Sequence, residues 1–321
     1  MPQSGARSKE AKMNTVMKAE TSFRVPAFEK VGSTLTDCLT VEQALVAGGL
    51  DWEVAAMPLL ANTPAGQMEI KDRVANTRIR NGEYDVLGVV GKDYQIVQNH
   101  EAFKVLDDIV DMSGANFNAA GALKGGKRQF ISMKIPQHIE FSNGDATDLY
   151  LFCTNSHDGK SAMRISVTPI RIACTNQIGA ITNSALSSFT IRHTSNALNR
   201  VQEARDTLQL TFTYIDAFQM EVERMIDSEF SGKQYENLVK DLFEYDARDC
   251  TERETERFSS LMNLWTAPTQ QNIKNTKWAA YNAVVEYLDW YAPAPNATVQ
   301  AERVLSSAQV QAKKGRVLQM L

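Results

Sequence analysis

The feature that most constrains this chain is the stretch from Leu149 to Asn196, in which apolar strand-like segments alternate with polar residues. Its sequence is LYLFCTNSHDGKSAMRISVTPIRIACTNQ and, after a short link, SSFTIRHTSN. Polar side chains that recur at strand ends and at alternate strand positions are typical of a sheet with one polar face. The stretch therefore predicts a sheet whose polar face is the best candidate for a binding or active surface.

Composition indicates a folded protein that stays outside the membrane. The 321 residues are 43% hydrophobic and 22% charged, which is enough for one large core or two smaller ones. No apolar run approaches the roughly 20 residues that cross a bilayer. Residues 1–23 lack the apolar centre of a secretory signal. We therefore expect a cytoplasmic protein with no membrane partner.

The cysteines do not indicate a disulfide framework or a zinc knuckle. All four are widely spaced and form no CxxC pair: Cys38, Cys153, Cys174 and Cys250. A site built from Cys153, Cys174, His157 and His193 would have the residue types of a zinc centre, but the spacing matches no known zinc pattern. We expect no metal and no cofactor.

Charge is distributed unevenly along the chain, although the net charge is only −4. Residues 121–200 hold nine Lys or Arg against four Asp or Glu, a net charge of +5. Residues 201–260 hold seven basic and fifteen acidic residues, a net charge of −8. A basic strand-rich block followed by an acidic helical block indicates one surface for an anionic ligand, with ordinary solvated charge as the alternative.

Periodicity predicts an α+β fold: an antiparallel sheet with a covering helix, followed by a long helix and an all-helical C-terminal region. Residues 1–25 are expected to be a disordered tail, 26–195 the sheet domain and 196–321 the helical region. The segments RVANTRI, YDVLGVVG and YQIVQN predict a β-meander, and residues 99–114 predict the covering helix. Gly125-Gly126 predicts a hairpin turn.

The sequence lacks the motifs of several enzyme classes. There is no GxSxG nucleophile elbow, no GxxxxGK[ST] phosphate loop and no GxGxxG after a strand. NSHDG places His157 beside Asp158, but adjacent strand residues point to opposite faces, so the two need not act together. An enzyme that acts on nucleotides or nucleic acids through NSHDG and His193 stays open as an alternative.

Binding of single-stranded nucleic acid needs only a positive groove and stacking side chains. The hairpin tip offers Lys124, Lys127 and Arg128 as a grip on the phosphate backbone. Further cations in the strand block are expected to form the groove, and polar residues nearby to donate hydrogen bonds: Lys160, Arg164, Arg171 and Arg192, then Asn155, Asn176 and His193. Stacking platforms, with core packing as the alternative, are Phe130, Tyr150, Phe152 and Phe189.

Four separate blocks occur in an order that resembles a known family. They are DWEV (51–54), VVGKDYQIVQNHEAF (89–103), NSHDGKSAMRISVTPIRIACTN (155–176) and IRHT (191–194). The chain is similar to the phage/plasmid-like proteins grouped as domain of unknown function 932. This resemblance implies a context of phages and mobile elements and supplies no activity. The positions that carry it are Asn155, His157, Asp158, Arg164, Pro169, Arg171, Asn176, Arg192 and His193.

The order of predicted elements is also similar in outline to phage single-strand annealing proteins, which work without ATP and as oligomers. By that analogy we expect an ATP-independent homo-oligomer that binds and anneals single-stranded DNA in the cytoplasm of a host cell, assisting recombination or replication. Besides the NSHDG enzyme, the remaining alternative is a protein that binds a host factor through its acidic helices, residues 201–260.

Overall fold

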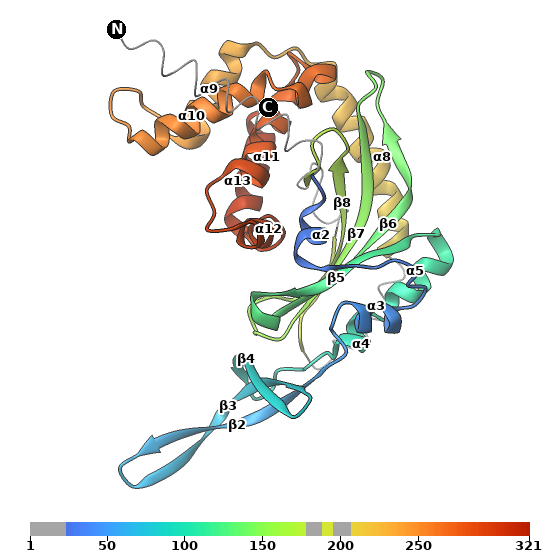
Figure 1. Cartoon of the computed structure of the whole chain (residues 1–321), viewed down its shortest axis with the longest axis vertical. Helices are drawn as coiled ribbons and strands as arrows, with labels where there is room; N and C mark the ends of the chain where they lie inside the picture. The colour runs from blue at the N-terminus through green and yellow to red at the C-terminus, as the bar shows by residue number, and fades with distance from the viewer. Residues whose placement is uncertain (1–23, 178–187, 195–206) are drawn as a thin grey trace.

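Seven antiparallel strands form the main sheet of the computed structural model, which describes residues 24–177, 188–194 and 207–321 (Figure 1). Their order is β1-β5-β6-β7-β8-β10, and β9 pairs with β8. The strands are β1 (Ser33–Thr34), β5 (Asn116–Leu123), β6 (Arg128–Glu140), β7 (Ala146–Ser156), β8 (Met163–Arg171), β9 (Asn176–Gln177) and β10 (Ser188–Ile191). The predicted tail, 1–25, falls almost wholly outside the described residues.

The turn between β5 and β6 forms where the glycine pair predicts it. A short 3-10 turn, η1 (Lys124–Gly126), joins the two strands. Gly125 and Gly126 adopt φ values of 68° and 92°, in the left-handed region that glycine enters without strain. A Cβ atom on Gly126 would also lie 2.4 Å from Arg78 Nη1. Both the positive φ and the lack of space for a side chain therefore favour glycine at this position. The predicted hairpin is confirmed.

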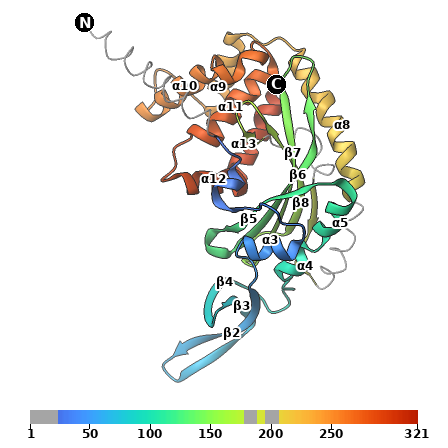
Figure 2. The same cartoon turned by 45° about the vertical axis from the view of Figure 1, so that its right-hand side comes forward.

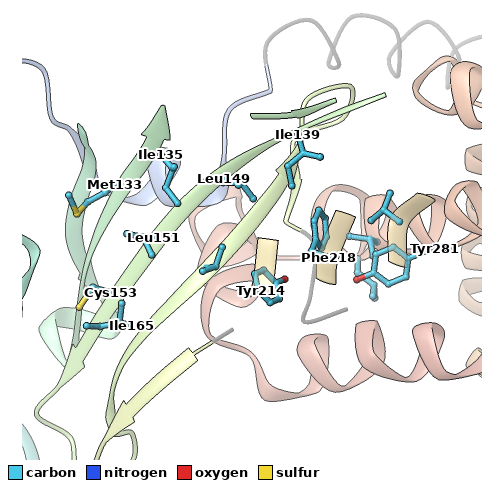
Figure 3. Close-up of a cluster of buried hydrophobic side chains, with 14 of the residues drawn as sticks. Met133, Ile135, Ile139, Leu149, Leu151, Cys153, Ile165, Tyr214, Phe218 and Tyr281 are labelled. Atoms are coloured by element: carbon cyan, nitrogen blue, oxygen red, sulfur yellow. The ribbon is translucent and has the colours of Figure 1, made fainter. Parts of the chain in front are cut away.

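Apolar clusters pack against both faces of the main sheet, so neither face is polar along its whole length. Leu149, Leu151 and Cys153 point to the side where helix α8 (Thr207–Ile226) packs through Tyr214 and Phe218 (Figure 3). Tyr150 and Phe152 point to the opposite side, where they join Phe28 and Leu305 in a second cluster. Consecutive residues of β7 point to opposite faces and are apolar on both, which is typical of a strand buried on both sides.

A smaller sheet projects from the main body (Figures 1 and 2). It consists of β2 (Glu53–Thr63), β3 (Gly66–Arg80) and β4 (Glu83–Gly91), in that order and antiparallel. The predicted third strand of the meander, YQIVQN, is not a strand. Its end instead caps a helix, because the Gln98 side chain and Glu101 form a capping box and the Gln98 amide also bonds the backbone of Val54.

Helices flank the main sheet and form the C-terminal region. The early ones are α2 (Ala27–Val31), α3 (Val41–Ala47), α4 (Asn99–Phe103) and α5 (Val105–Ser113). After α8 come α9 (Gly232–Phe243), α10 (Glu252–Trp265), η3 (Pro268–Ile273), α11 (Lys277–Glu286), the short π-helix η4 (Tyr287–Tyr291), α12 (Ala297–Ser306) and α13 (Ala308–Met320). Hydroxyl side chains of Thr40, Ser231 and Thr251 cap α3, α9 and α10.

The fold is α+β, as predicted. Among the described residues, no helix has the length and hydropathy for a bilayer crossing.

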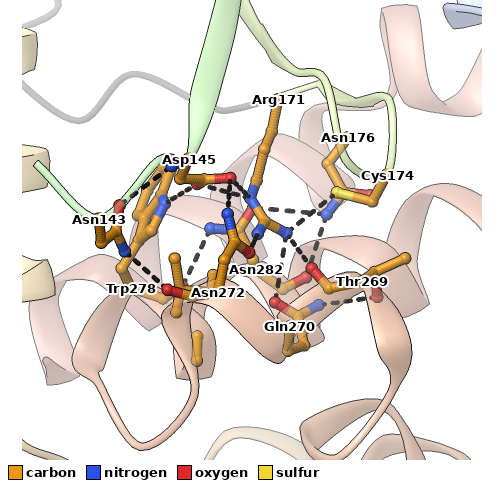
Figure 4. A network of polar contacts seen from close by, with 12 residues as sticks. Asn143, Asp145, Arg171, Cys174, Asn176, Thr269, Gln270, Asn272, Trp278 and Asn282 are labelled. Atoms are coloured by element: carbon orange, nitrogen blue, oxygen red, sulfur yellow. Dashed lines mark hydrogen bonds and ion pairs between the residues drawn. The ribbon is translucent and has the colours of Figure 1, made fainter. Parts of the chain in front are cut away.

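Arg171 ties the end of β8 to the C-terminal helices. Its guanidinium is fully buried and lies 2.8 Å from a carboxylate oxygen of Asp145, which precedes β7 (Figure 4). The same guanidinium donates to the Thr269 carbonyl at 2.8 Å and to Asn272 at 3.1 Å, both in η3. Trp278 in α11 donates to Asp145 at 2.8 Å. The buried charges therefore hold four elements together.

We expect Arg171→Ala to lower the free energy of unfolding by about 3–5 kcal/mol, because the change leaves the Asp145 carboxylate buried without its charge partner. Urea denaturation followed by circular dichroism measures the loss. Arg248→Ala is the matched control, since the Arg248 side chain is 91% exposed and its removal is expected to change stability by less than about 1 kcal/mol. Equal stability of the two variants would contradict the expectation.

Candidate functional site

A groove lies between the Phe152 face of the main sheet and the turn that joins α12 to α13. Its volume is about 730 Å³. The sheet side is formed by residues of β5 to β10, and the helix side includes Leu305, Ser306, Ser307 and Gln311. Figures 1 and 2 show α12 beside α2, which places the helix over this face of the sheet. We call it the basic groove, because Arg128, Lys160 and Arg164 line it.

Strand register gathers cations from distant parts of the sequence in the basic groove. Arg128 in β6 pairs with Ser156 in β7, and Thr154 pairs with Arg164 in β8. Side chains at paired positions of neighbouring strands share a face, so Arg128 and Arg164 both point toward the groove. Lys160 enters from the turn between β7 and β8. Three of the predicted phosphate contacts thus line one surface.

The lining of the basic groove has the chemistry of an anion site. None of the described residues that line it is Asp or Glu. Besides the three cations it carries seven hydroxyl side chains: Thr154, Ser161, Ser166, Thr168, Ser188, Ser306 and Ser307. Arg, Lys, Ser and Thr are the side chains that supply most protein contacts to phosphate oxygens.

A second recess continues from the basic groove past Arg128. Its volume is about 470 Å³, and its lining includes Lys124, Arg128 and Arg303. Glu302 is the acidic member, and its carboxylate accepts a hydrogen bond from the Lys124 backbone N–H at 3.1 Å. Arg303 belongs to α12 and lies 175 positions beyond Arg128, so only the folded chain reveals it as a neighbour.

Asp158 of the NSHDG segment positions Arg128. The Arg128 Nε lies 3.9 Å from the Asp158 carboxylate, and Nη1 donates to the Ser306 carbonyl at 3.5 Å. Asp158 is itself held by the Ser156 hydroxyl at 3.2 Å and the Lys160 backbone N–H at 2.8 Å. The carboxylate is therefore held in place beside a groove cation.

Two predicted cations are exposed outside the groove lining. Lys127 lies in the β5–β6 turn region, where its carbonyl accepts a hydrogen bond from the His157 backbone N–H at 3.0 Å. Arg192 follows β10 and is exposed as well. Neither residue is among the described residues that line the basic groove or the recess.

The prediction that Arg171 and Asn176 lie on an open groove is wrong. Arg171 is fully buried in the network of Figure 4. Asn176 is also fully buried, and its amide donates to the Asn282 carbonyl in α11 at 3.2 Å. Arg171 and Arg164 belong to the same strand but are seven positions apart, an odd separation that puts them on opposite faces.

Asn155 is among the residues that line the basic groove, but its side chain and that of His193 make their hydrogen bonds inward, which contradicts their predicted role as surface hydrogen-bond donors. The Asn155 amide donates to the Val97 carbonyl at 3.0 Å, and the residue is 1% exposed. His193 stacks on Tyr94 with ring centroids 5.0 Å apart, and its Nδ1 lies 3.3 Å from the Gln95 carbonyl. Both side chains thus connect the main sheet to the segment before α4.

His157 is sealed in the same interior region. Its Nε2 lies 3.1 Å from the Asn99 amide oxygen, and the ring packs edge-on against Trp52. Burial, helped by the nearby His193 and opposed by Asp158, lowers the pKa of His157 from 6.5 to about 3. The described residues contain no cluster of three His, Cys, Asp or Glu that could hold a metal ion. A buried neutral imidazole of this kind gives the NSHDG enzyme hypothesis no support.

Three of the four predicted stacking platforms are core residues. Phe130, Tyr150 and Phe152 pack with Phe28 on the sheet face under α2. They are at most 5% exposed, so the core alternative is the correct one for these three. Phe152 still borders the basic groove. Phe189 in β10 is half-buried.

Comparison with known proteins identifies the family. Residues 86–313 match the model of a family described as Domain of unknown function (DUF932). The chain therefore belongs to this family, and the predicted resemblance is confirmed to that extent. No curated protein and no solved structure is significantly similar to it.

The lowered pKa of His157 predicts that acid destabilises the fold. His157 is neutral when folded, so unfolding takes up a proton below pH 6.5, and stability falls as the pH drops from 6.5 toward 3. Between pH 7 and pH 5 we expect a loss of about 2 kcal/mol from this group. The lowered pKa of His193 adds to the same trend.

Urea denaturation at the two pH values measures this loss, and His157→Gln is expected to reduce it. His138→Gln is the control, because His138 is half exposed and its ring lies beside Glu140. A pH dependence that stays unchanged in His157→Gln would contradict the assignment.

Proposed function

We propose that this chain is an ATP-independent protein of a phage or mobile element that binds and anneals single-stranded DNA in the basic groove. It would act as a homo-oligomer in the host cytoplasm and assist recombination or replication. The observation that carries the proposal is the convergence of Arg128, Lys160 and Arg164 on one groove without a described acidic neighbour in its lining. Such a surface attracts a polyanion whatever its sequence.

The size of the groove favours one strand over a duplex. About 730 Å³ is within the range of roughly 300–1,000 Å³ that encloses small ligands, so the groove has room for a few nucleotides at a time. The recess at Lys124 and Arg303 shares Arg128 with the groove and adds to its basic surface. A strand that leaves the groove past the β5–β6 turn would therefore continue to meet cations.

ATP independence is supported by the motif content of the sequence. The chain contains no GxxxxGK[ST] phosphate loop, and its Gly125-Gly126 pair is part of a hairpin turn that carries no nucleotide-binding helix. Binding energy from phosphate contacts alone is sufficient for strand holding, since it supplies most of the affinity of non-specific nucleic-acid binding.

Removing two groove cations together is expected to weaken DNA binding. If Lys124, Arg128, Lys160, Arg164 and Arg303 all contact phosphates, log K against log salt has a slope of about −3.5, at roughly −0.7 per contact. The double variant Lys160→Ala with Arg164→Ala should lower affinity on the order of tenfold or more and flatten the slope by about 1.4. Fluorescence anisotropy with a labelled oligonucleotide at several salt concentrations measures both.

The matched control is Lys127→Ala with Arg192→Ala, which also removes one Lys and one Arg that are exposed, but outside the groove lining. We expect this control to bind nearly as tightly as the wild type. Equal losses in the two double variants would reject the groove as the binding site.

Annealing is tested separately with two complementary strands that carry a fluorophore and a quencher. The wild-type protein is expected to accelerate quenching without ATP, and Lys160→Ala with Arg164→Ala to do so less. Tight binding of one strand with no acceleration would leave a strand-binding protein and remove annealing from the proposal.

A further inference from the structure

One face of the small sheet leaves the side chains of its edge strand β4 in solvent, while Ala75 and Thr77 in its central strand are only 3% and 4% exposed. In β2, β3 and β4 the residues of this face form three cross-strand rows. The rows are Glu53–Ile79–Tyr84, Ala55–Thr77–Val86 and Met57–Ala75–Val89. We call this the outer face. Apart from Glu53 and Thr77 it consists of apolar side chains and one tyrosine.

The edge strand leaves its large side chains in solvent. Tyr84 is 65%, Val86 59% and Val89 52% exposed. A β-bulge opposite Asn76 and Thr77 puts Val86 and Val89 on the same face, while Leu87 between them is buried. Scattered exposed apolar residues need no explanation, but a contiguous exposed patch on a sheet indicates an interaction surface.

The other face of the small sheet is already occupied, so the outer face cannot turn inward. Arg78 lies over the Trp52 ring, 5.4 Å from its centroid, and the Asn76 amide donates to the His157 carbonyl at 2.9 Å. A Cβ on Gly88 would lie 2.7 Å from the Asp158 backbone, which shows how closely β4 approaches the NSHDG turn. These contacts fix the orientation of the small sheet against the main body.

Opposite charges stand at the two ends of the outer face. Glu53 is exposed in the row that ends it on one side. Arg73, in the register position beyond Ala75, ends it on the other side; its side chain is 56% exposed and its Nε lies 3.8 Å from the exposed Asp72 carboxylate. The two rows lie six positions apart along β3, or about 20 Å. A face with an apolar centre and one charge of each sign at its ends is complementary to itself when rotated by 180°.

We propose that the outer face binds the outer face of a second copy of this chain in a two-fold symmetric dimer. The two-fold axis runs along the central row, Ala55–Thr77–Val86, between the two facing sheets. Rotation by 180° about this axis places Glu53 of each copy near Arg73 of the other and packs the β4 side chains of the two copies against each other. Isologous contacts of this kind close on themselves, which suits a discrete dimer. The inference supplies the surface for the self-association in the proposed function, and it does not depend on nucleic-acid binding.

Sedimentation velocity of the full chain without nucleic acid tests the dimer. Val86→Asp is expected to raise the dissociation constant by roughly 30-fold or more, because it places a charge at the centre of the interface in both copies. Met220→Asp is the matched control, since Met220 is 74% exposed on α8, away from the outer face, and should associate like the wild type. Circular dichroism confirms that both variants fold.

Charge reversal tests the two-fold arrangement. Glu53→Arg and Arg73→Glu should each weaken association by roughly 3- to 10-fold, and the double variant should restore it, because the opposite charges meet again across the axis. A double variant as weak as the sum of the two single changes would overturn this arrangement. A wild-type chain that stays monomeric at its highest soluble concentration, or a Val86→Asp variant that associates normally, would overturn the proposal. DNA binding is measured separately, so its failure is distinguishable from either result.

Discussion

The junction between the main sheet and the C-terminal helices depends on a buried ion pair. Arg171 and Asp145 lie 2.8 Å apart with side chains 0% and 1% exposed, and burial of two charges costs free energy unless every polar atom around them is bonded. Thr269, Asn272 and Trp278 supply those bonds from η3 and α11. Each of these elements contributes a partner, so the network ties the end of the sheet to η3 and α11.

The basic groove is a consequence of that arrangement. The C-terminal helices cover the sheet face near Phe152, and α13 is fixed there by Lys314, which is fully buried 2.7 Å from Asp289. The turn between α12 and α13 then meets the sheet along the ends of β6, β7 and β8 and leaves a groove instead of a closed core. No described Asp or Glu lines this groove, so its cations Arg128, Lys160 and Arg164 have no carboxylate neighbour within the lining. Asp158, beside Arg128, lies outside the lining.

Part of this site was predictable from the sequence, and part was not. The cationic hairpin tip and the strand-borne Arg164 follow from the glycine pair and from strand periodicity. Strand periodicity also predicts Arg171 on this surface, although its odd separation from Arg164 in one strand indicates the opposite face. Asn155, Asn176 and His193 turn inward because their partners, Val97, Asn282 and Tyr94, are brought to them by packing. Arg303 could not be assigned, since nothing in α12 marks it as a neighbour of the β5–β6 turn.

The sequence by itself determined the α+β class, the β5–β6 hairpin, the helical caps and the family, because these depend on local residue preferences and on motifs along the chain. The tertiary structure decided which polar residues are available to a ligand. Exposure of a side chain depends on what packs against it, and here η3, α11 and α12 reach the sheet from more than 90 positions away. For that reason Arg164 stays in solvent, while Arg171 in the same strand belongs to the interior.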